Sequence, residues 1–178
     1  MKDKIFIDEC LEKYVFAIRQ KNIVPKLIEL KNILLETQAK NKKVIIAGNG
    51  GSAAIASHVS VDFTKQGGVR TINFNEADLI TCFSNDYGYE NCLAKCIEFY
   101  ADNGDHLILI SSSGRSKNII NAALEAKKKE MLITSFTGFN KDNDLSKFSD
   151  LFFWVDSRSY NIIENMHQIW LLIVCDML

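Results

Sequence analysis

The segment Lys43-Val-Ile-Ile-Ala-Gly-Asn-Gly-Gly-Ser52 sets the architecture of this chain. Its first half, residues 43–47, is a short, largely apolar run, which is typical of a strand buried on both faces of a sheet. Its second half is rich in glycine and leads into a helical pattern over residues 52–65. A buried strand that passes through glycines into a helix begins a strand–helix–strand unit, in which the two strands are parallel.

The same alternation of strand and helix continues to the end of the chain. We expect four more strands, at residues 69–74, 106–111, 131–137 and 151–155. Helices are predicted at residues 78–101, with a break near Asn85, and at residues 116–130 and 161–178. This order predicts an α/β fold, a doubly wound and mostly parallel five-stranded sheet with helices on both faces. Such sheets bind ligands at the carboxyl ends of their strands, near the point where the strand order reverses.

Two helices are predicted ahead of the first strand. Apolar residues return at three- and four-residue steps over the first 20 residues, and Pro25 is expected in the first turn of a second helix. Residues 1–40 then form a helical extension of a single domain over residues 1–178, packed on the core or on a partner subunit. The last helix is apolar nearly all round over residues 169–174, so it has to be buried on every side. These features predict a homo-oligomer.

The composition excludes several classes of protein. Of the 178 residues, 47% are hydrophobic and 24% charged, which is close to the globular average and unlike a disordered chain. The 21 basic and 22 acidic residues give a net charge of −1, without the basic surplus that nucleic-acid binding favours. No apolar run approaches the roughly 18 residues that span a bilayer, and the first residues lack the apolar core of a signal peptide. We therefore expect a cytoplasmic protein without nucleic-acid or membrane partners.

The five cysteines are scattered and include no CxxC pair. Cys92 and Cys96 lie four residues apart in a predicted helix, where they could flank a metal ion. Buried thiols in a reducing compartment are the interpretation that this pattern favours.

Two loops at strand ends carry the residues suited to ligand binding. The first, residues 47–53, has glycines that let the backbone approach a ligand, and Ser52 at a helix start. Its pattern also fits a dinucleotide-binding fingerprint, but the acid that normally follows the second strand has only the displaced Glu76 as a candidate. A tight turn without a ligand is the remaining alternative for this loop.

The second loop, Ile110-Ser-Ser-Ser-Gly-Arg-Ser116, follows the third strand. Its hydroxyl groups, its glycine and the helix that starts after it suit a phosphate. The lysine of a nucleotide-triphosphate P-loop is missing, which disfavours a triphosphate with magnesium. A serine-capped helix with spare hydroxyls would give the same pattern. The two loops together favour binding of a small phosphorylated molecule.

Three motifs in order resemble the sugar isomerase (SIS) domain family: Gly48-Asn-Gly-Gly-Ser52, Ser84-Asn-Asp-Tyr-Gly88 and Ile110-Ser-Ser-Ser-Gly-x-Ser116. Within that family the chain is similar to the phosphoheptose isomerases, and the resemblance covers nearly the whole chain. It implies an SIS fold and an aldose–ketose isomerase that acts on sedoheptulose 7-phosphate. It also implies a homotetramer with its sites between subunits.

The resemblance also implies which residues bind the sugar phosphate. The first loop would contact sugar hydroxyls through Asn49, Gly50, Gly51 and Ser52. The serine loop would hold the phosphate through Ser111, Ser112, Ser113 and Ser116. The sugar chain would contact Asn85 and Asp86.

The acid/base residues depart from the family pattern. The family has a histidine and a glutamate four residues apart on the first core helix, where this chain has His58 and Asp62. On the last helix Glu164 replaces a glutamine, and Leu172 replaces a histidine that acts in catalysis or binds zinc. The only histidine left on this helix is His167, three residues after Glu164 and therefore expected on a similar face of the helix. We therefore expect Asp62, Glu164 and His167 to carry the proton transfers of catalysis.

The same side chains suggest a metal as an alternative. His58, Asp62 and Glu164 supply nitrogen and oxygen donors of the kind that zinc accepts. The expectation is therefore either no required cofactor or a zinc ion.

Three functions remain open at this stage. The first is a heptose phosphate isomerase that feeds lipopolysaccharide or capsule precursors in a bacterium. The second is a non-catalytic SIS protein that binds a phosphosugar or a protein partner, which the leucine at position 172 favours. The third is a dinucleotide-binding enzyme, which the serine loop disfavours.

Overall fold

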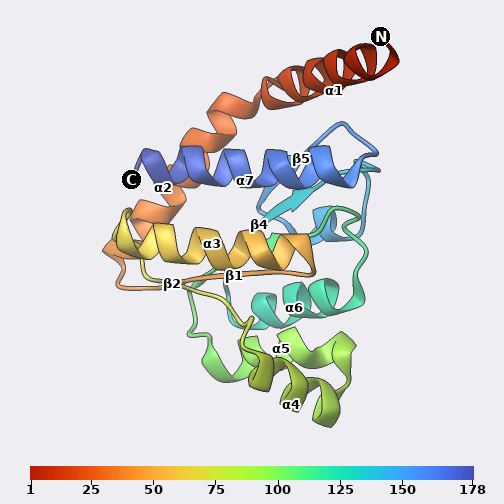
Figure 1. Ribbon diagram of the computed structural model, residues 1–178. Helices are drawn as coiled ribbons and strands as arrows, with labels where there is room; N and C mark the ends of the chain where they lie inside the picture. Colours follow the sequence, from red (N-terminus) through yellow and green to blue (C-terminus); the bar gives the residue numbers. More distant parts are fainter.

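The computed structural model describes all residues, 1–178, and forms a sheet of five parallel strands with helices on both faces (Figure 1). The strands are β1 (Val44–Gly48), β2 (Thr71–Ile72), β3 (His106–Ile110), β4 (Leu132–Thr137) and β5 (Leu151–Trp154). The helices are α1 (Lys2–Ile18), α2 (Ile23–Ala39), α3 (Gly51–Lys65), α4 (Ala77–Tyr87), α5 (Tyr89–Tyr100), α6 (Lys117–Lys128) and α7 (Tyr160–Asp176). A short 3-10 helix, η1 (Leu145–Phe148), precedes β5. The predicted doubly wound α/β fold is confirmed, and every strand pairing is parallel.

The strand order is β2-β1-β3-β4-β5, so the order reverses between β1 and β3. In a doubly wound sheet this is the place where the loops diverge and leave a crevice. The two loops singled out from the sequence are the ones that follow β1 and β3. The topology therefore brings both loops to one edge of the sheet.

Two apolar clusters hold the layers together, one on each face of the sheet. Alternate residues of a strand point to opposite faces, so Val44 and Ile46 join α2, α3 and α7, whereas Ile45 and Ala47 join α5 and α6. β1 and β3 are buried along their whole length, which explains the continuous apolar runs in their sequences. The packing fixes the carboxyl ends of these strands, and with them the loops.

Two boundaries differ from the sequence prediction. The strand predicted at residues 69–74 is only Thr71–Ile72, because Asn73 and Asn75 turn their amide groups to α3 and bond to Ser60 and Ala53. The break in the helical segment 78–101 falls at Gly88 rather than near Asn85. Gly88 adopts a φ of +80°, which a glycine accepts without strain and which no helix continues.

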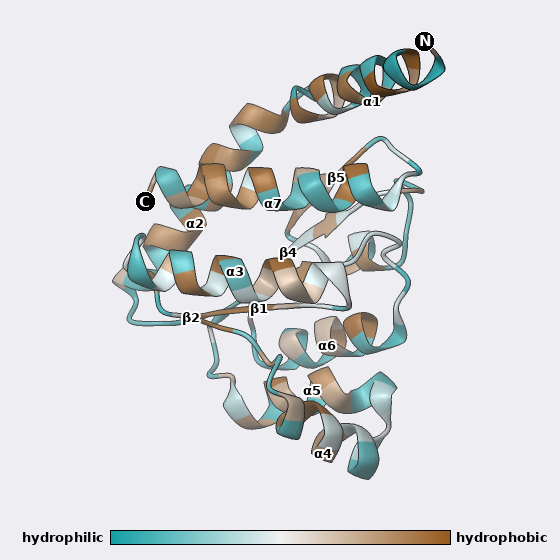
Figure 2. Ribbon diagram, in the orientation of Figure 1, coloured by the Kyte–Doolittle hydropathy of each residue, from teal (hydrophilic) through white to brown (hydrophobic).

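The first half of α1 projects from the rest of the chain (Figure 1), whereas its last turns pack on α7 through Tyr14, Ala17 and Ile18. Figure 2 shows apolar residues along the whole helix. Phe6 and Phe16 are 66% and 70% exposed. By contrast, α2 packs on α7 and β5 and contributes Leu27, Leu30 and Leu34 to the core. No helix in the structure is long and apolar enough to cross a bilayer.

Candidate functional site

A small polar cavity of about 120 Å³ lies where the loops after β1 and β3 meet the start of α7. Its lining consists of Asn49, Ser52, Ile110, Ser111, Ser112, Ser113, Ser116, Tyr160 and Glu164. The structure therefore brings six of the predicted binding residues and one predicted catalytic residue to one place. Gly50 and Gly51 lie in the loop between Asn49 and Ser52.

The first loop needs two of its glycines for different reasons. Gly50 precedes α3 with a φ of +54°, in the left-handed region that favours glycine. Gly51 lies against Glu164, and a Cβ atom at this position would stand 2.8 Å from the carboxyl carbon of that residue. The absence of a side chain at Gly51 thus makes room for the carboxylate at the rim of the cavity.

The serine loop forms the floor of the cavity. Ser111 and Ser112 are both buried. The Oγ atom of Ser111 accepts a hydrogen bond from the Gly114 N–H at 3.2 Å, so it is committed to the shape of the loop. The Oγ atom of Ser112 is buried and has no hydrogen-bond partner. Buried polar groups are usually paired, so this hydroxyl is free to bond a polar group of a ligand in the cavity that Ser112 lines.

Three helices begin at this cavity: α3 after Gly50, α6 after Ser116 and α7 after Ser159. None of the three has a side-chain hydrogen bond at its N-cap. The N–H groups of Ser52, Ala53 and Ile119 bond to carbonyls of the preceding residues, whereas those of residues 117–118 and 160–162 have no backbone acceptor. The helix dipoles place partial positive charge at the same ends. The cavity is therefore suited to an anion such as a phosphate.

A hydrogen-bonded trio holds the first loop against α6. Asn49 and Asn118 exchange side-chain amide bonds of 3.0 and 2.8 Å, and the Tyr89 hydroxyl donates to the Asn49 Oδ1 atom at 2.8 Å. Burial raises the pKa of Tyr89, so its hydroxyl stays a donor at neutral pH. Tyr89 and Asn118 were not predicted from the sequence, because they lie on α5 and α6 and no motif around them indicates a contact with the first loop.

Glu164 and Tyr160 lie one turn apart on α7, and both line the cavity. Glu164 is half-buried and has no ion-pair partner in the chain. Tyr160 is 59% exposed, and its ring contacts that of Phe139 edge to face, with 4.9 Å between the ring centres. Tyr160 was not among the residues predicted from the sequence.

Four other predicted residues lie outside this cavity. Asn85 and Asp86 are exposed on α4, where the Asn85 amide donates to the neighbouring Asp86 carboxylate at 2.9 Å. His58 and Asp62 form an ion pair of 3.1 Å on α3, and His58 also contacts Gln168 of α7 at 3.1 Å. Seven residues along a helix separate His58 from Gly51, a rise of about 10 Å.

His167 lies in the core rather than in the cavity. Its ring is fully buried, contacts the ring of Phe136 edge to face, and donates from Nε2 to the Thr137 carbonyl at 3.1 Å. Burial lowers the pKa of this imidazole to about 4, so it is neutral at physiological pH. The structure corrects the expectation that His167 shares the face of Glu164, and its position gives no support to a role in proton transfer.

The zinc alternative needs three ligands at one point, each about 2 Å from the ion. Glu164 lies beside Gly51, whereas Asp62 follows eleven residues later on α3, about 16 Å along the helix axis. No group of three histidine, cysteine or acidic side chains in the chain is arranged to hold a metal ion. His58, Asp62 and Glu164 of one chain therefore do not fit a shared zinc ion.

Comparisons with known proteins agree with this geometry. Residues 16–138 match the family model described as the SIS domain. A phosphoheptose isomerase from Sulfurimonas denitrificans is 33% identical over 98% of this chain and 94% of its own length. One from Helicobacter pylori is 33% identical over 94% of this chain and 88% of its own length.

The same fold occurs in solved structures of two such enzymes. The structure from Neisseria gonorrhoeae has a TM-score of 0.89 and 24% identity, and covers 99% of this chain and 96% of its own. The structure from Francisella tularensis has a TM-score of 0.88 and 23% identity, and covers 99% of this chain and 95% of its own. The chain therefore belongs to the SIS domain family, and within that family it resembles the phosphoheptose isomerases.

Proposed function

We propose that this chain is an aldose–ketose isomerase that converts sedoheptulose 7-phosphate to D-glycero-D-manno-heptose 7-phosphate. Its relatives of 33% identity carry the name phosphoheptose isomerase. The observation that carries the proposal is the buried and unpartnered Ser112 hydroxyl in a cavity onto which three uncapped helix N-termini converge. In a bacterium the product would supply lipopolysaccharide or capsule precursors.

The reaction exchanges protons between neighbouring atoms. A base removes a proton from C1 of the ketose and returns one to C2, while protons move between the two oxygens, so the carbonyl passes from C2 to C1. We propose Glu164 as the base at the cavity, since its carboxylate has no competing cation. The serine loop holds the phosphate and fixes the sugar relative to this carboxylate.

The pair His58–Asp62 is proposed to complete a neighbouring subunit's site. It lies outside the cavity of its own chain, and the side chain of His58 is 49% exposed. If Asp62 and Glu164 come from different chains, then mixed tetramers of Asp62→Asn and Glu164→Gln subunits regain part of the activity that each variant alone has lost. Mixtures that stay inactive would place both residues in one chain's site and refute the proposal.

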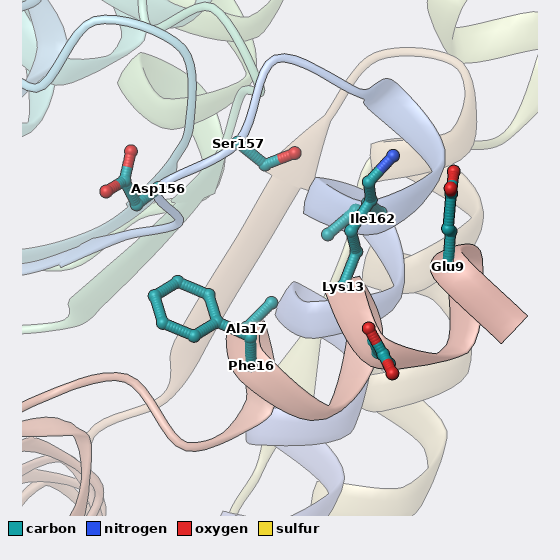
Figure 3. Close-up of a pocket in the computed structure, with 8 residues that line it drawn as sticks. Glu9, Lys13, Phe16, Ala17, Asp156, Ser157 and Ile162 are labelled. Carbon is teal, nitrogen blue, oxygen red and sulfur yellow. The ribbon is translucent and has the colours of Figure 1, made fainter.

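A homotetramer of single-domain subunits is the proposed assembly. The apolar side of α1 is exposed in one chain, and α7 leaves Ile173 partly exposed although the helix is apolar nearly all round. A crevice of about 450 Å³ lies between α1 and the segment that joins β5 to α7. Figure 3 shows Phe16 and Lys13 on the α1 side and Asp156 on the other. These surfaces support burial against further copies of the chain.

We propose that the reaction needs no cofactor and takes place in the cytoplasm. Zinc is the alternative; because His58, Asp62 and Glu164 of one chain lie too far apart to share an ion, zinc would have to be held between two chains. Dialysis against a chelator should leave turnover unchanged, whereas a zinc enzyme would lose activity and regain it when zinc is restored.

The deciding experiment follows sedoheptulose 7-phosphate by NMR in the presence of the purified protein, beside a panel of other ketose phosphates. Appearance of the aldose signal is the expected result. Binding of the sugar phosphate without turnover of any ketose would favour the non-catalytic alternative. Leu172, an apolar side chain packed on the core, is the observation that keeps this alternative in view.

A further inference from the structure

The cavity is too small for a whole seven-carbon sugar phosphate. Its volume of about 120 Å³ lies well below the roughly 300–1,000 Å³ of complete small-molecule sites. The buried residues Ser52, Ser111 and Ser112 line the cavity, and serine hydroxyl groups suit a phosphate. The carbon chain must therefore leave the cavity across its exposed rim.

The length of the substrate sets a second condition. Eight bonds separate the phosphorus atom from C1, and three bonds of an extended chain advance about 3.5 Å, so an extended sugar spans about 9 Å. Glu164 lines the same small cavity as the phosphate loop. For the C1 and C2 atoms to approach this carboxylate, the chain has to turn back after it leaves the floor.

Tyr160 is the largest of the side chains that line the cavity, and it lies beside Glu164. It is the first residue of α7, four residues before Glu164, so the two side chains share one face of the helix. Its ring is held by the edge-to-face contact with Phe139. Its hydroxyl has no hydrogen-bond partner in the chain, unlike the hydroxyl of Tyr89, which bonds to Asn49.

We propose that Tyr160 is a positioning residue that determines the chain length of the substrate. Its ring forms the wall over which the carbon chain turns, and its hydroxyl bonds a chain hydroxyl group, so that C1 and C2 come to Glu164. The inference rests on the proposed function, because it takes a sugar phosphate as the ligand. It concerns the carbon chain alone and assigns Tyr160 no contact with the phosphate.

The test compares Tyr160→Ala and Tyr160→Phe with the unmodified protein, using inorganic phosphate, ribulose 5-phosphate and sedoheptulose 7-phosphate as probes in calorimetry. Tyr160→Ala should leave the Kd for inorganic phosphate within about twofold, because the floor is intact. It should raise the Kd for sedoheptulose 7-phosphate at least about tenfold, and the Kd for ribulose 5-phosphate by a smaller factor. Tyr160→Phe, which lacks only the hydroxyl, should weaken sedoheptulose 7-phosphate by about three- to tenfold, as for one hydrogen bond.

Kinetics separates positioning from mere affinity. If the wall turns the chain, Tyr160→Ala lowers kcat as well as raising KM. Tyr100→Phe is the matched control. Tyr100 is 50% exposed, against 59% for Tyr160, and it lies at the end of α5, near the edge of the sheet where β3 begins. This variant should change none of these values.

Two patterns would overturn the inference while leaving the proposed function standing. Equal losses of affinity for inorganic phosphate and for sedoheptulose 7-phosphate would mean that Tyr160 acts on the phosphate or on the serine loop. No loss for any ligand would mean that the chain does not cross Tyr160. An unmodified protein that binds no sugar phosphate would instead refute the proposed function, and the inference with it.

Discussion

Replacing Ser112 by alanine should weaken phosphosugar binding and at the same time leave the free protein as stable as before, or more stable. The Ser112 hydroxyl is buried and makes no hydrogen bond in the chain. An unpaired buried polar group costs about 1–3 kcal/mol, so its removal should raise the free energy of unfolding or leave it unchanged. The same removal takes a donor from the phosphate.

The size of the binding effect follows from the charge of the ligand. A hydrogen bond to a charged group contributes about 1.5–3 kcal/mol, and each 1.4 kcal/mol is a factor of ten in Kd. Ser112→Ala should therefore raise the Kd for a sugar phosphate by about ten- to a hundredfold. The nearby Ser111→Ala is the informative comparison, because its hydroxyl accepts from the Gly114 N–H. That variant should weaken binding and lower stability together.

Titration calorimetry with sedoheptulose 7-phosphate gives the affinity, and urea denaturation of the free protein gives the stability. An unchanged Kd for Ser112→Ala would refute the reasoning, since the phosphate would then have to bind elsewhere. A loss of stability in the free protein would show that the hydroxyl has a partner within the fold.

Four further predictions concern catalysis, assembly and pH. Glu164→Gln should lower kcat at least about a hundredfold with Kd nearly unchanged; a gain in activity would show that Glu164 is not the base. Asp62→Asn should also lower kcat about a hundredfold if Asp62 and His58 complete the site of a neighbouring subunit. Steady-state kinetics that show an unchanged kcat for this variant would contradict that role. Sedimentation at micromolar concentration should give four times 20.2 kDa, about 81 kDa, and a 20 kDa species would refute the tetramer. Burial lowers the pKa of His106 and of His167 to about 4, so between about pH 6.5 and pH 4 the unfolded state binds more protons than the folded state. The free energy of unfolding should therefore decrease as the pH is lowered through this window, by about 1.4 kcal/mol per pH unit for each histidine, which urea denaturation at several pH values measures.

The layers of the fold were predictable because each strand carries its own signal. β1 and β3 are buried on both faces, so their sequences are continuous apolar runs that end at glycine or serine. β2 was overestimated for a reason that is not local. Asn73 could have continued the strand, but its side-chain amide donates to Ser60 on α3. The residues around Asn73 in the sequence do not predict that contact.

The floor of the cavity was predictable and its wall was not. Glycines and serines at the ends of β1 and β3 are local features, and the strand order brings them together. Tyr160 lines the cavity, and Tyr89 and Asn118 bond to Asn49 at its edge, so the three come from three different helices. Each is an ordinary polar residue in its own segment, and only the three-dimensional packing selects it.

The rotation of α7 explains why His167 and Glu164 were expected on one side and lie on two. A helix that is apolar nearly all round has no marked face, so its sequence leaves its rotation about the axis undetermined. In the structure the rotation is set by large side chains. Trp170 packs on Phe153, and Phe153 stacks on Phe136. His167, one turn before Trp170, is carried inward with it, whereas Glu164 is left beside Gly51. We therefore propose carboxylates rather than a histidine of α7 as the acid/base groups. Replacing Glu164, which lines the cavity, tests this chemistry more directly than replacing the buried His167, whose loss would first disturb the core packing.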